Sequence, residues 1–255
     1  MHRPPFVFPP KRLTLCARGR ARALLAAALA VAVGTAAAQS AAPTSTYSPA
    51  ERLLFMSEPL PTLKPPLTLS YRFQKSGALE PGFEDRVAID LRAAADGSCC
   101  AVVGRFLSGE RAVMLPDIEQ AKSNPMLLYF LEHDVRDMNR LTKGSAAYFR
   151  KRIRLAIADD ATVRDVALTY QGRTIAGRLI EIEPYRNDPT RQRYARYADK
   201  AYQFYVSDAV PGGIYGMRSV MRGATAGEPP LIVEQMFIEG GSAPAEPPTQ
   251  ETPRS

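Results

Sequence analysis

The apolar residues of this chain repeat with two different periods, and this change of period limits the folds that the chain can adopt. Over residues 67–73 every second residue is apolar, which is typical of a half-buried β-strand. Over residues 125–159 the spacing becomes three and four residues, which is typical of amphipathic helices. The two-residue alternation returns at Val166. Separate runs of strands and helices indicate an α+β fold, because an α/β fold would alternate the two elements.

The helical segment divides into two helices. Asn124-Pro125 is a suitable start for the first, Gly144 is a suitable stop, and Ser145 can cap the second. The first helix carries an apolar stripe formed by Leu127, Leu131, Val135, Met138 and Leu141. The second carries a stripe formed by Phe149, Ile153, Ala156 and Ile157. Polar residues of the first helix are expected mostly on its opposite face; these are Glu132, His133, Arg136 and Asp137.

A further short helix is predicted ahead of the first strand. Ser48 and Glu51 have the spacing of a capping box, and Pro49 stands at the first helical position. This helix must end before the proline cluster that begins at Pro59, because proline is poorly tolerated inside a helix.

The strands ahead of the helical pair are joined by short turns such as Asp96-Gly97, so they form an antiparallel meander. A sheet of this kind has one face to bury, and the apolar stripes of the helices offer a matching surface. We therefore predict a curved antiparallel sheet, an incomplete barrel, packed against the mid-chain helical pair. Residues 48–239 are expected to form this single α+β domain, between a flexible lead at 39–47 and a disordered tail at 240–255.

The first 38 residues differ in composition from the rest of the chain. They hold six of the 33 basic residues and no Asp or Glu, and an apolar run at 23–33 precedes the small residues Ala36-Ala37-Ala38. This pattern matches a secretory signal peptide cleaved near Ala38. The alternative is an uncleaved membrane anchor, although spanning a bilayer takes about 20 apolar residues and this run is shorter. We expect a protein of the periplasm, or a secreted one.

Removal of this segment changes the charge balance. The whole chain has a formal net charge of +7, but the remaining 27 basic residues would face 26 acidic ones, for a net charge of +1. A nucleic-acid partner is therefore not expected, because phosphate binding needs a concentrated basic surface. No later stretch is apolar enough for a transmembrane span, so none is expected after cleavage.

Two adjacent cysteines, Cys99 and Cys100, remain after cleavage, in a compartment that favours oxidation. They form either a disulfide between neighbours or a pair of thiols, one buried and one partly exposed. Together with His133 they do not supply the four ligands of a zinc site. We predict neither a metal nor a cofactor.

The predicted compartment, the size and the order of elements over residues 48–239 resemble the periplasmic half-barrel family that includes the outer-membrane lipoprotein carriers LolA and LolB. The resemblance implies an incomplete barrel whose concave apolar cavity holds acyl chains. It assigns no individual binding residue, because no motif is shared.

Three functions remain open. The first is a non-enzymatic protein that binds a lipid or another apolar ligand in a cavity between sheet and helices. Its candidate lining residues are Leu127, Leu131, Met138, Phe149 and Ile153, facing Tyr71, Ile89 and Phe204. Apolar burial would drive such binding, but the same residues also suit an ordinary filled core.

The second function is a structural or protein-interaction subunit of a cell-envelope assembly. The third is a hydrolase that uses His133 and the carboxylates beside it, since a neighbouring carboxylate can tune a histidine as a general base. The chain has no G-x-S-x-G nucleophile elbow and no phosphate-binding loop. No residue is therefore assigned a catalytic role.

Overall fold

The structure is a computed structural model that describes residues 46–113, 115–225 and 227–244. The predicted signal peptide, nearly all of the flexible lead and residues 245–255 of the predicted tail lie outside the described residues. Within the described ranges, no helix is both long and apolar enough to cross a membrane.

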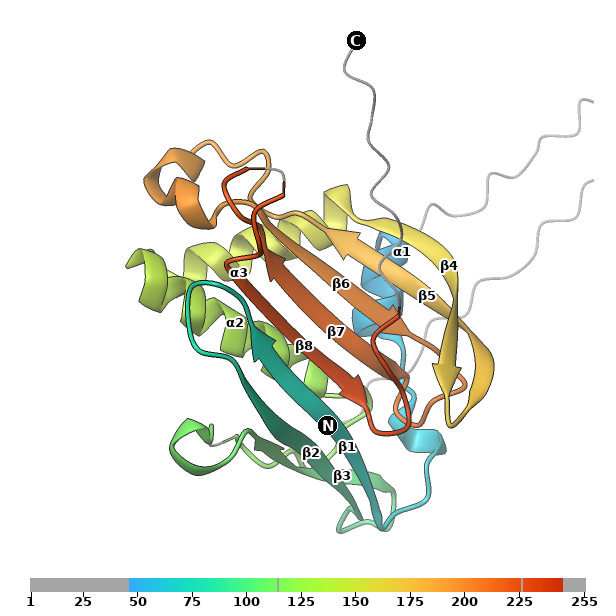
Figure 1. Ribbon diagram of the computed structural model, residues 1–255. Coiled ribbons are helices and arrows are strands. Elements are labelled where there is room, and N and C mark those ends of the chain that lie inside the picture. Colours follow the sequence, from blue (N-terminus) through green and yellow to red (C-terminus); the bar gives the residue numbers. More distant parts are fainter. Residues whose placement is uncertain (1–45, 114, 226, 245–255) are drawn as a thin grey trace, which may run out of the picture. The chain divides into compact units, whose positions relative to one another are not determined.

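One sheet of eight antiparallel strands organises the domain, in the order β3-β2-β1-β8-β7-β6-β5-β4. The strands are β1 (Leu67–Ser76), β2 (Phe83–Ala93), β3 (Cys99–Phe106), β4 (Thr162–Tyr170), β5 (Arg173–Ile182), β6 (Lys200–Val206), β7 (Ile214–Met221) and β8 (Ile232–Ile238). The first and last strands meet in its middle, where Tyr71 of β1 is paired with Ile238 of β8. In the described residues the edge strands β3 and β4 do not pair with each other, so the barrel is incomplete (Figure 1).

Two mid-chain helices, α2 and α3, lie against one face of the sheet (Figure 1). The helical elements are α1 (Pro49–Glu51), η1 (Arg52–Met56), η2 (Leu60–Thr62), η3 (Gly109–Arg111), α2 (Met126–Thr142), α3 (Ala146–Leu155), η4 (Ala156–Asp160) and η5 (Arg191–Tyr197). The predicted α+β fold, with its curved antiparallel sheet and mid-chain helical pair, is confirmed.

The predicted capping box opens the first helix. Ser48 Oγ accepts a hydrogen bond from the backbone N–H of Glu51 at 3.1 Å, and the Glu51 carboxylate accepts one from the backbone N–H of Ser48 at 2.8 Å. These bonds satisfy two donors that a helix N-terminus leaves free. Ser48 Oγ also lies 3.1 Å from the carbonyl oxygen of Ile157, so the cap joins α1 to η4.

The core lies between the sheet and the layer of α2 and α3. Tyr71, Phe204 and Met236 from the sheet and Phe130 and Met138 from α2 are fully buried there. Side chains alternate between the two faces of a strand. Residues two positions before or after these core residues therefore also face the helices. Several of those positions are charged, and their partners on α2 form part of the site described below.

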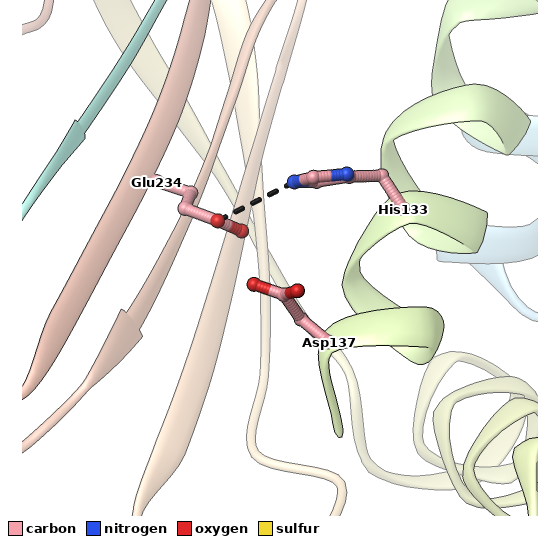
Figure 2. Close-up of side chains that lie close together, drawn as sticks. All are labelled: His133, Asp137 and Glu234. Carbon is pink, nitrogen blue, oxygen red and sulfur yellow. Dashed lines mark hydrogen bonds and ion pairs between the residues drawn. The ribbon is translucent and has the colours of Figure 1, made fainter. Parts of the chain in front are cut away.

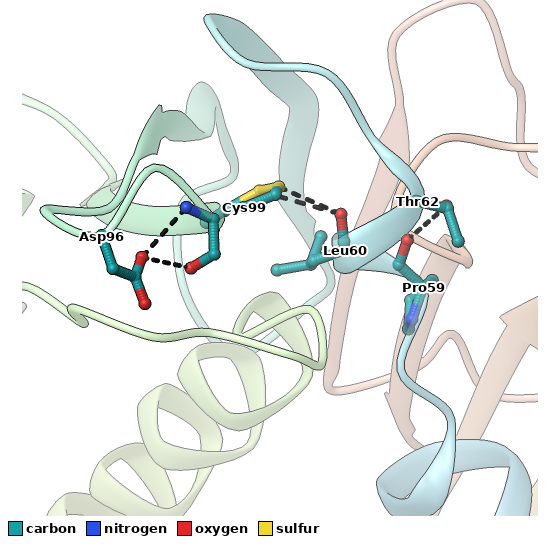
Figure 3. The surroundings of a disulfide bond; sticks show 7 residues. Pro59, Leu60, Thr62, Asp96 and Cys99 are labelled. Carbon is teal, nitrogen blue, oxygen red and sulfur yellow. Dashed lines mark hydrogen bonds between the residues drawn. A yellow bond between two sulfur atoms is a disulfide. The ribbon is translucent and has the colours of Figure 1, made fainter.

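Cys99 and Cys100 are joined by a disulfide (Figure 3). The sequence left open a disulfide or a pair of free thiols, and the structure has the disulfide. The sulfur of Cys99 lies 3.1 Å from the carbonyl oxygen of Leu60 in η2. The turn before it is held by Asp96, whose carboxylate accepts hydrogen bonds from the N–H and hydroxyl of Ser98.

The first residues of the predicted tail have partners. The carbonyl of Gly240 accepts a hydrogen bond from the backbone N–H of Gln171 at 2.7 Å, and the backbone N–H of Ser242 donates to the Tyr215 hydroxyl at 3.0 Å. These contacts hold residues 240–242 beside the turn between β4 and β5.

Candidate functional site

A pocket of about 650 Å³ opens between α2, α3, η1 and the segment that follows β3. This volume falls within the roughly 300–1,000 Å³ of small-molecule sites. Most of its lining side chains are apolar; these are Phe55, Phe106, Val113, Leu115, Pro116, Leu128, Tyr129, Leu131, Val135, Ile153 and Ile157. The other lining residues are charged or carry an imidazole; these are Glu51, Glu132, His133, Arg136, Arg150 and Arg154, and Tyr129 adds a titratable hydroxyl.

Helix geometry explains why α2 serves both the pocket and the core. Leu128, Leu131 and Val135 recur at intervals of three and four, so they share the side of α2 that lines the pocket. Phe130 and Asp134 occupy the side that packs on the sheet. On α3, Ile153 and the following Ile157 of η4 are four residues apart and add the second wall.

Part of this lining is left open to water. Large apolar side chains are normally covered, yet Leu128 is 58% exposed and Phe55 is 37% exposed. Both line the pocket, and Met56, next to Phe55, is also exposed. Apolar surface of Leu128 and Phe55 is therefore left open to water at the pocket.

Arginines and glutamates form the rim. The guanidinium of Arg150 donates two hydrogen bonds to the Glu132 carboxylate, at 2.6 and 2.8 Å, and Arg136 lies 3.7 Å from the same group. The hydrogen bond and charge of Arg150 hold the pKa of Glu132 below its usual value. The carboxylate of Glu51 is bonded to the helix start at Ser48.

His133 connects the pocket with the interior. It lines the pocket, and its ring lies 5.6 Å from the Phe73 ring and 5.3 Å from the Phe106 ring, centre to centre. Its Nε2 is 3.4 Å from Oε1 of Glu234 on β8 (Figure 2). Burial lowers the pKa of His133, but the hydrogen bond and charge of Glu234, together with the charges of Asp137 and Asp134, outweigh burial, so the pKa is raised above its ordinary value.

The prediction that His133 and Asp137 lie on a polar outer face is wrong. Both face the sheet, His133 toward Glu234 and Asp137 toward Lys75 on β1. The partners are charged residues on distant strands. The spacing of apolar residues along one helix cannot reveal them.

Lys75 is the centre of a partly buried ion cluster. Its ammonium lies 2.9 Å from Glu80, 2.9 Å from Asp137 and 3.0 Å from Glu234. The side chain of Glu234 is 1% exposed, and its second oxygen, Oε2, has no hydrogen-bond partner among the described residues.

Three residues of this region have ligand atoms close enough to hold a metal. Ligand atoms of His133, Asp137 and Glu234 lie within 4.8 Å of one another (Figure 2). The ammonium of Lys75 already bridges the two carboxylates, at 2.9 and 3.0 Å. A dication placed beside that ammonium would be repelled by it, so the donor set suits a lysine better than a metal.

A second cluster surrounds Asp134 of α2, which is fully buried. Its carboxylate pairs with Lys200, accepts a hydrogen bond from the Tyr202 hydroxyl at 2.6 Å and accepts one from the Ser219 hydroxyl at 3.1 Å. All four side chains are buried, so this cluster fastens α2 to β6 and β7 and presents no reactive group to solvent.

The structure separates the eight predicted lining residues into two groups. Leu131 and Ile153 line the pocket. The other six lie buried in the hydrophobic core; these are Tyr71, Ile89, Leu127, Met138, Phe149 and Phe204. Contact of any of the eight with a ligand stays a prediction.

Sequence reasoning did not single out several lining residues. Leu128 stands next to Leu127 of a predicted apolar stripe, and Phe55 falls in the short helix predicted after Ser48. An apolar residue at such a position is the one signal that could have indicated either. Leu115 and Phe106 come from a different part of the chain, and no local pattern links them to α2.

No protein-family model and no curated protein matches this chain. Among solved structures, it is similar to the lipoprotein LppX of Mycobacterium tuberculosis, with a TM-score of 0.29 and 7% sequence identity. The match covers 70% of this chain and 88% of that one. Likeness at this level assigns neither ligand nor activity, which must come from the site itself.

Proposed function

We propose that this is an exported, non-enzymatic protein that binds a lipid or another apolar ligand in the pocket between α2, α3, η1 and the segment after β3. One observation supports this more than any other. A pocket of about 650 Å³ has mainly apolar walls, and large side chains such as Leu128 remain exposed at it. Covering apolar surface contributes about 25 cal/mol per Å², before the cost of ordering the ligand.

This location differs from the one that the sequence favoured. The space between sheet and helices is occupied by side chains such as Tyr71, Met138 and Phe204, which are buried. The pocket lies along the flank of α2, where α3 and η1 leave its apolar residues uncovered. The ligand would therefore bind beside the helices and not inside the incomplete barrel.

A non-enzymatic role fits the chemistry of the lining. Among the described residues that line the pocket there is no Ser, Thr, Cys or Lys to act as a nucleophile. The carboxylate of Glu132 is held by Arg150, and His133 faces Glu234. Both groups therefore already have charged partners, which supports ligand binding more than hydrolysis at this site.

Export is part of the same proposal, and it rests on the composition of residues 1–38. We expect cleavage near Ala38, so that the protein of the cell envelope begins at or close to Gln39. Sequencing the N-terminus of the protein isolated from its compartment tests this. A chain that still begins at Met1 would support the uncleaved anchor instead.

A second candidate function is docking of a partner protein in a cell-envelope assembly. It is favoured by the exposure of Phe55, Met56 and Leu128, because such surface also suits an apolar segment of another chain. Native mass spectrometry of the purified mature protein separates the two functions. A bound apolar small molecule supports the first, and a stoichiometric protein partner without extractable lipid supports the second.

A pocket-filling variant tests the location. Leu131→Trp enlarges a partly buried side chain that lines the pocket. The larger side chain should occupy the pocket and reduce binding of a fluorescent fatty-acid probe. Leu141→Trp is the matched control, since Leu141 is partly buried on the same helix but does not line the pocket. Equal probe binding by wild type and both variants would place the ligand elsewhere.

A further inference from the structure

We propose that the ligand is a single-chain amphiphile with an anionic headgroup, whose hydrocarbon chain covers the apolar wall and whose headgroup is held by Arg154. This inference rests on the proposed function and specifies its ligand class. Three features carry it: the excess of arginine on the rim, the partners that the rim carboxylates already have, and the position of Arg154 beside the apolar wall.

The rim has more positive than negative charge. Arg136, Arg150 and Arg154 line the pocket, against the two carboxylates of Glu51 and Glu132. A ligand anion is therefore attracted to this opening, whereas a cation is repelled.

Both rim carboxylates already have partners. Glu132 accepts two hydrogen bonds from Arg150 and lies within ion-pair distance of Arg136. Glu51 accepts a hydrogen bond from the backbone N–H of Ser48. Its negative charge also lies at the N-terminus of the first helix, where the helix dipole is positive. A cationic headgroup would compete with these interactions for the same carboxylates.

Arg154 is the rim cation without such a partner. In the described part of the chain, no carboxylate lies within ion-pair distance of its guanidinium, and the side chain is exposed. An arginine fork can bind a carboxylate or phosphate with two parallel hydrogen bonds. It can therefore take an anionic headgroup without losing an existing ion pair.

The neighbours of Arg154 fit the rest of the ligand. Ile153 and Ile157 line the pocket next to it along the chain, and Leu128 and Leu131 line it from α2. The cationic group and the apolar wall are thus adjacent, which is the arrangement that an amphiphile with one charged end requires. A molecule with a buried polar centre would find few hydrogen-bond partners on that wall.

The experiment compares three probes of equal chain length at concentrations below micelle formation: dodecanoate, dodecanol and dodecyltrimethylammonium. Isothermal titration of the mature chain at neutral pH should give the highest affinity for dodecanoate. Arg154→Gln should weaken dodecanoate binding about fivefold, as expected for a solvent-accessible ion pair. It should leave dodecanol binding unchanged, because the alcohol carries no charge.

Lys151→Gln is the matched control. It removes one positive charge from the same helix, but Lys151 is exposed and does not line the pocket. Its dodecanoate affinity should equal that of the wild type. If both variants lose affinity equally, the effect comes from net charge and the assignment to Arg154 is wrong.

The chain length of the probe tests the apolar wall separately. In the series decanoate, dodecanoate and tetradecanoate, affinity should rise about fourfold per methylene until the wall is covered.

Equal affinity for all three headgroups would overturn the anionic class and leave the proposed function standing. Binding of none of the probes would overturn the proposed function itself.

A membrane surface is the other source of the same headgroup chemistry. Vesicles of zwitterionic lipid with and without an anionic lipid are therefore tested by co-sedimentation. Binding to anionic vesicles without binding of monomeric dodecanoate would overturn the single-chain ligand in favour of a membrane surface. Dodecanoate binding without co-sedimentation supports the ligand proposed here.

Discussion

A single histidine, His133, lies where the pocket and the ion cluster meet. His133 lines the pocket, and its Nε2 faces Glu234, which has a nearly inaccessible side chain. The other charged groups that act on these two side chains are Asp134, Asp137, Lys75 and Lys200. Because the negative charges outweigh the effect of burial, the folded state holds the proton on His133 more tightly than the unfolded chain does.

This arrangement predicts how stability depends on pH. The raised pKa of His133 contributes stability that is complete below the unfolded value of about 6.5 and is lost as pH rises through the higher folded value. Urea unfolding across this range should show a falling free energy of unfolding for the wild type. His133→Gln keeps a polar side chain but cannot titrate, so its profile should be flatter. Parallel profiles would mean that other groups control the pH dependence.

Lys75 is predicted to be the most sensitive residue of the ion cluster. Lys75→Met removes the cation that lies within 3.0 Å of Asp137 and Glu234, and it leaves a buried carboxylate without that charge. Losing one partner of a buried pair costs about 3–5 kcal/mol in the free energy of unfolding. Chemical denaturation measures it, and adding Glu234→Gln should recover part of the loss. Exposed Lys151→Met should change stability by less than about 0.5 kcal/mol.

At the scale of elements, α2 has more than one buried side. Its sheet side carries Asp134 and Asp137 as well as Phe130, and its flank carries Leu131 and Val135 toward the pocket. The simplest interpretation of such a helix is one apolar stripe that packs on one core. This interpretation explains neither the charged residues of α2 that face the sheet nor the apolar residues that line the pocket.

The short helix at the start of the domain supports the pocket. Ser48 caps α1 and contacts the carbonyl of Ile157, while Phe55 of η1 and Ile157 itself line the pocket. Ser48→Ala should therefore cost about 1 kcal/mol of stability, as for other lost helix caps. It should also weaken dodecanoate binding, because two walls of the pocket lose their connection.

Thermal unfolding and titration of dodecanoate check the two effects. Ser57→Ala is the control, since Ser57 is exposed after η1 and its hydroxyl bonds only to the Leu53 carbonyl among the described contacts. Its backbone carbonyl, which accepts from the Ser123 hydroxyl, is unchanged by the substitution. If Ser48→Ala lowers stability but leaves affinity unchanged, the cap has no influence on the pocket walls.

Local signals predicted the elements well. The capping box at Ser48, the alternation from Leu67 and the helical spacing after Pro125 each depend on neighbours in sequence, and each element is present. The pairing of β1 with β8 depends on residues more than 150 positions apart, as in Tyr71 and Ile238, so local periodicity could not reveal it.

The candidate site was harder to predict for the same reason. Leu131 and Ile153 were named from helical spacing, and both line the pocket. Phe106 and Leu115 reach it from the segment around β3, and the partners of His133 and Asp137 come from β8 and β1. Only the fold brings these residues together, so the apolar pattern identified one residue on each of the two helical walls and missed the rest of the lining.

At the scale of the whole molecule, the proposed binding surface lies at the edge of the core and shares Phe106, Val135, Ile153 and Ile157 with it. Side chains such as Phe204 and Met236 occupy the space between sheet and helices, while the pocket lies along the flank of α2. Ligand binding therefore needs no opening of the core.

One measurement addresses the binding surface directly. The chain contains no tryptophan, so Leu128→Trp places a single fluorescent reporter at an exposed position in the pocket. Ile175→Trp places the same reporter on β5, away from the pocket. Titration with dodecanoate should shift the emission of the first variant to shorter wavelength, saturably, and leave the second unchanged. No shift in the first variant, or equal shifts in both, would show that the pocket does not hold the ligand.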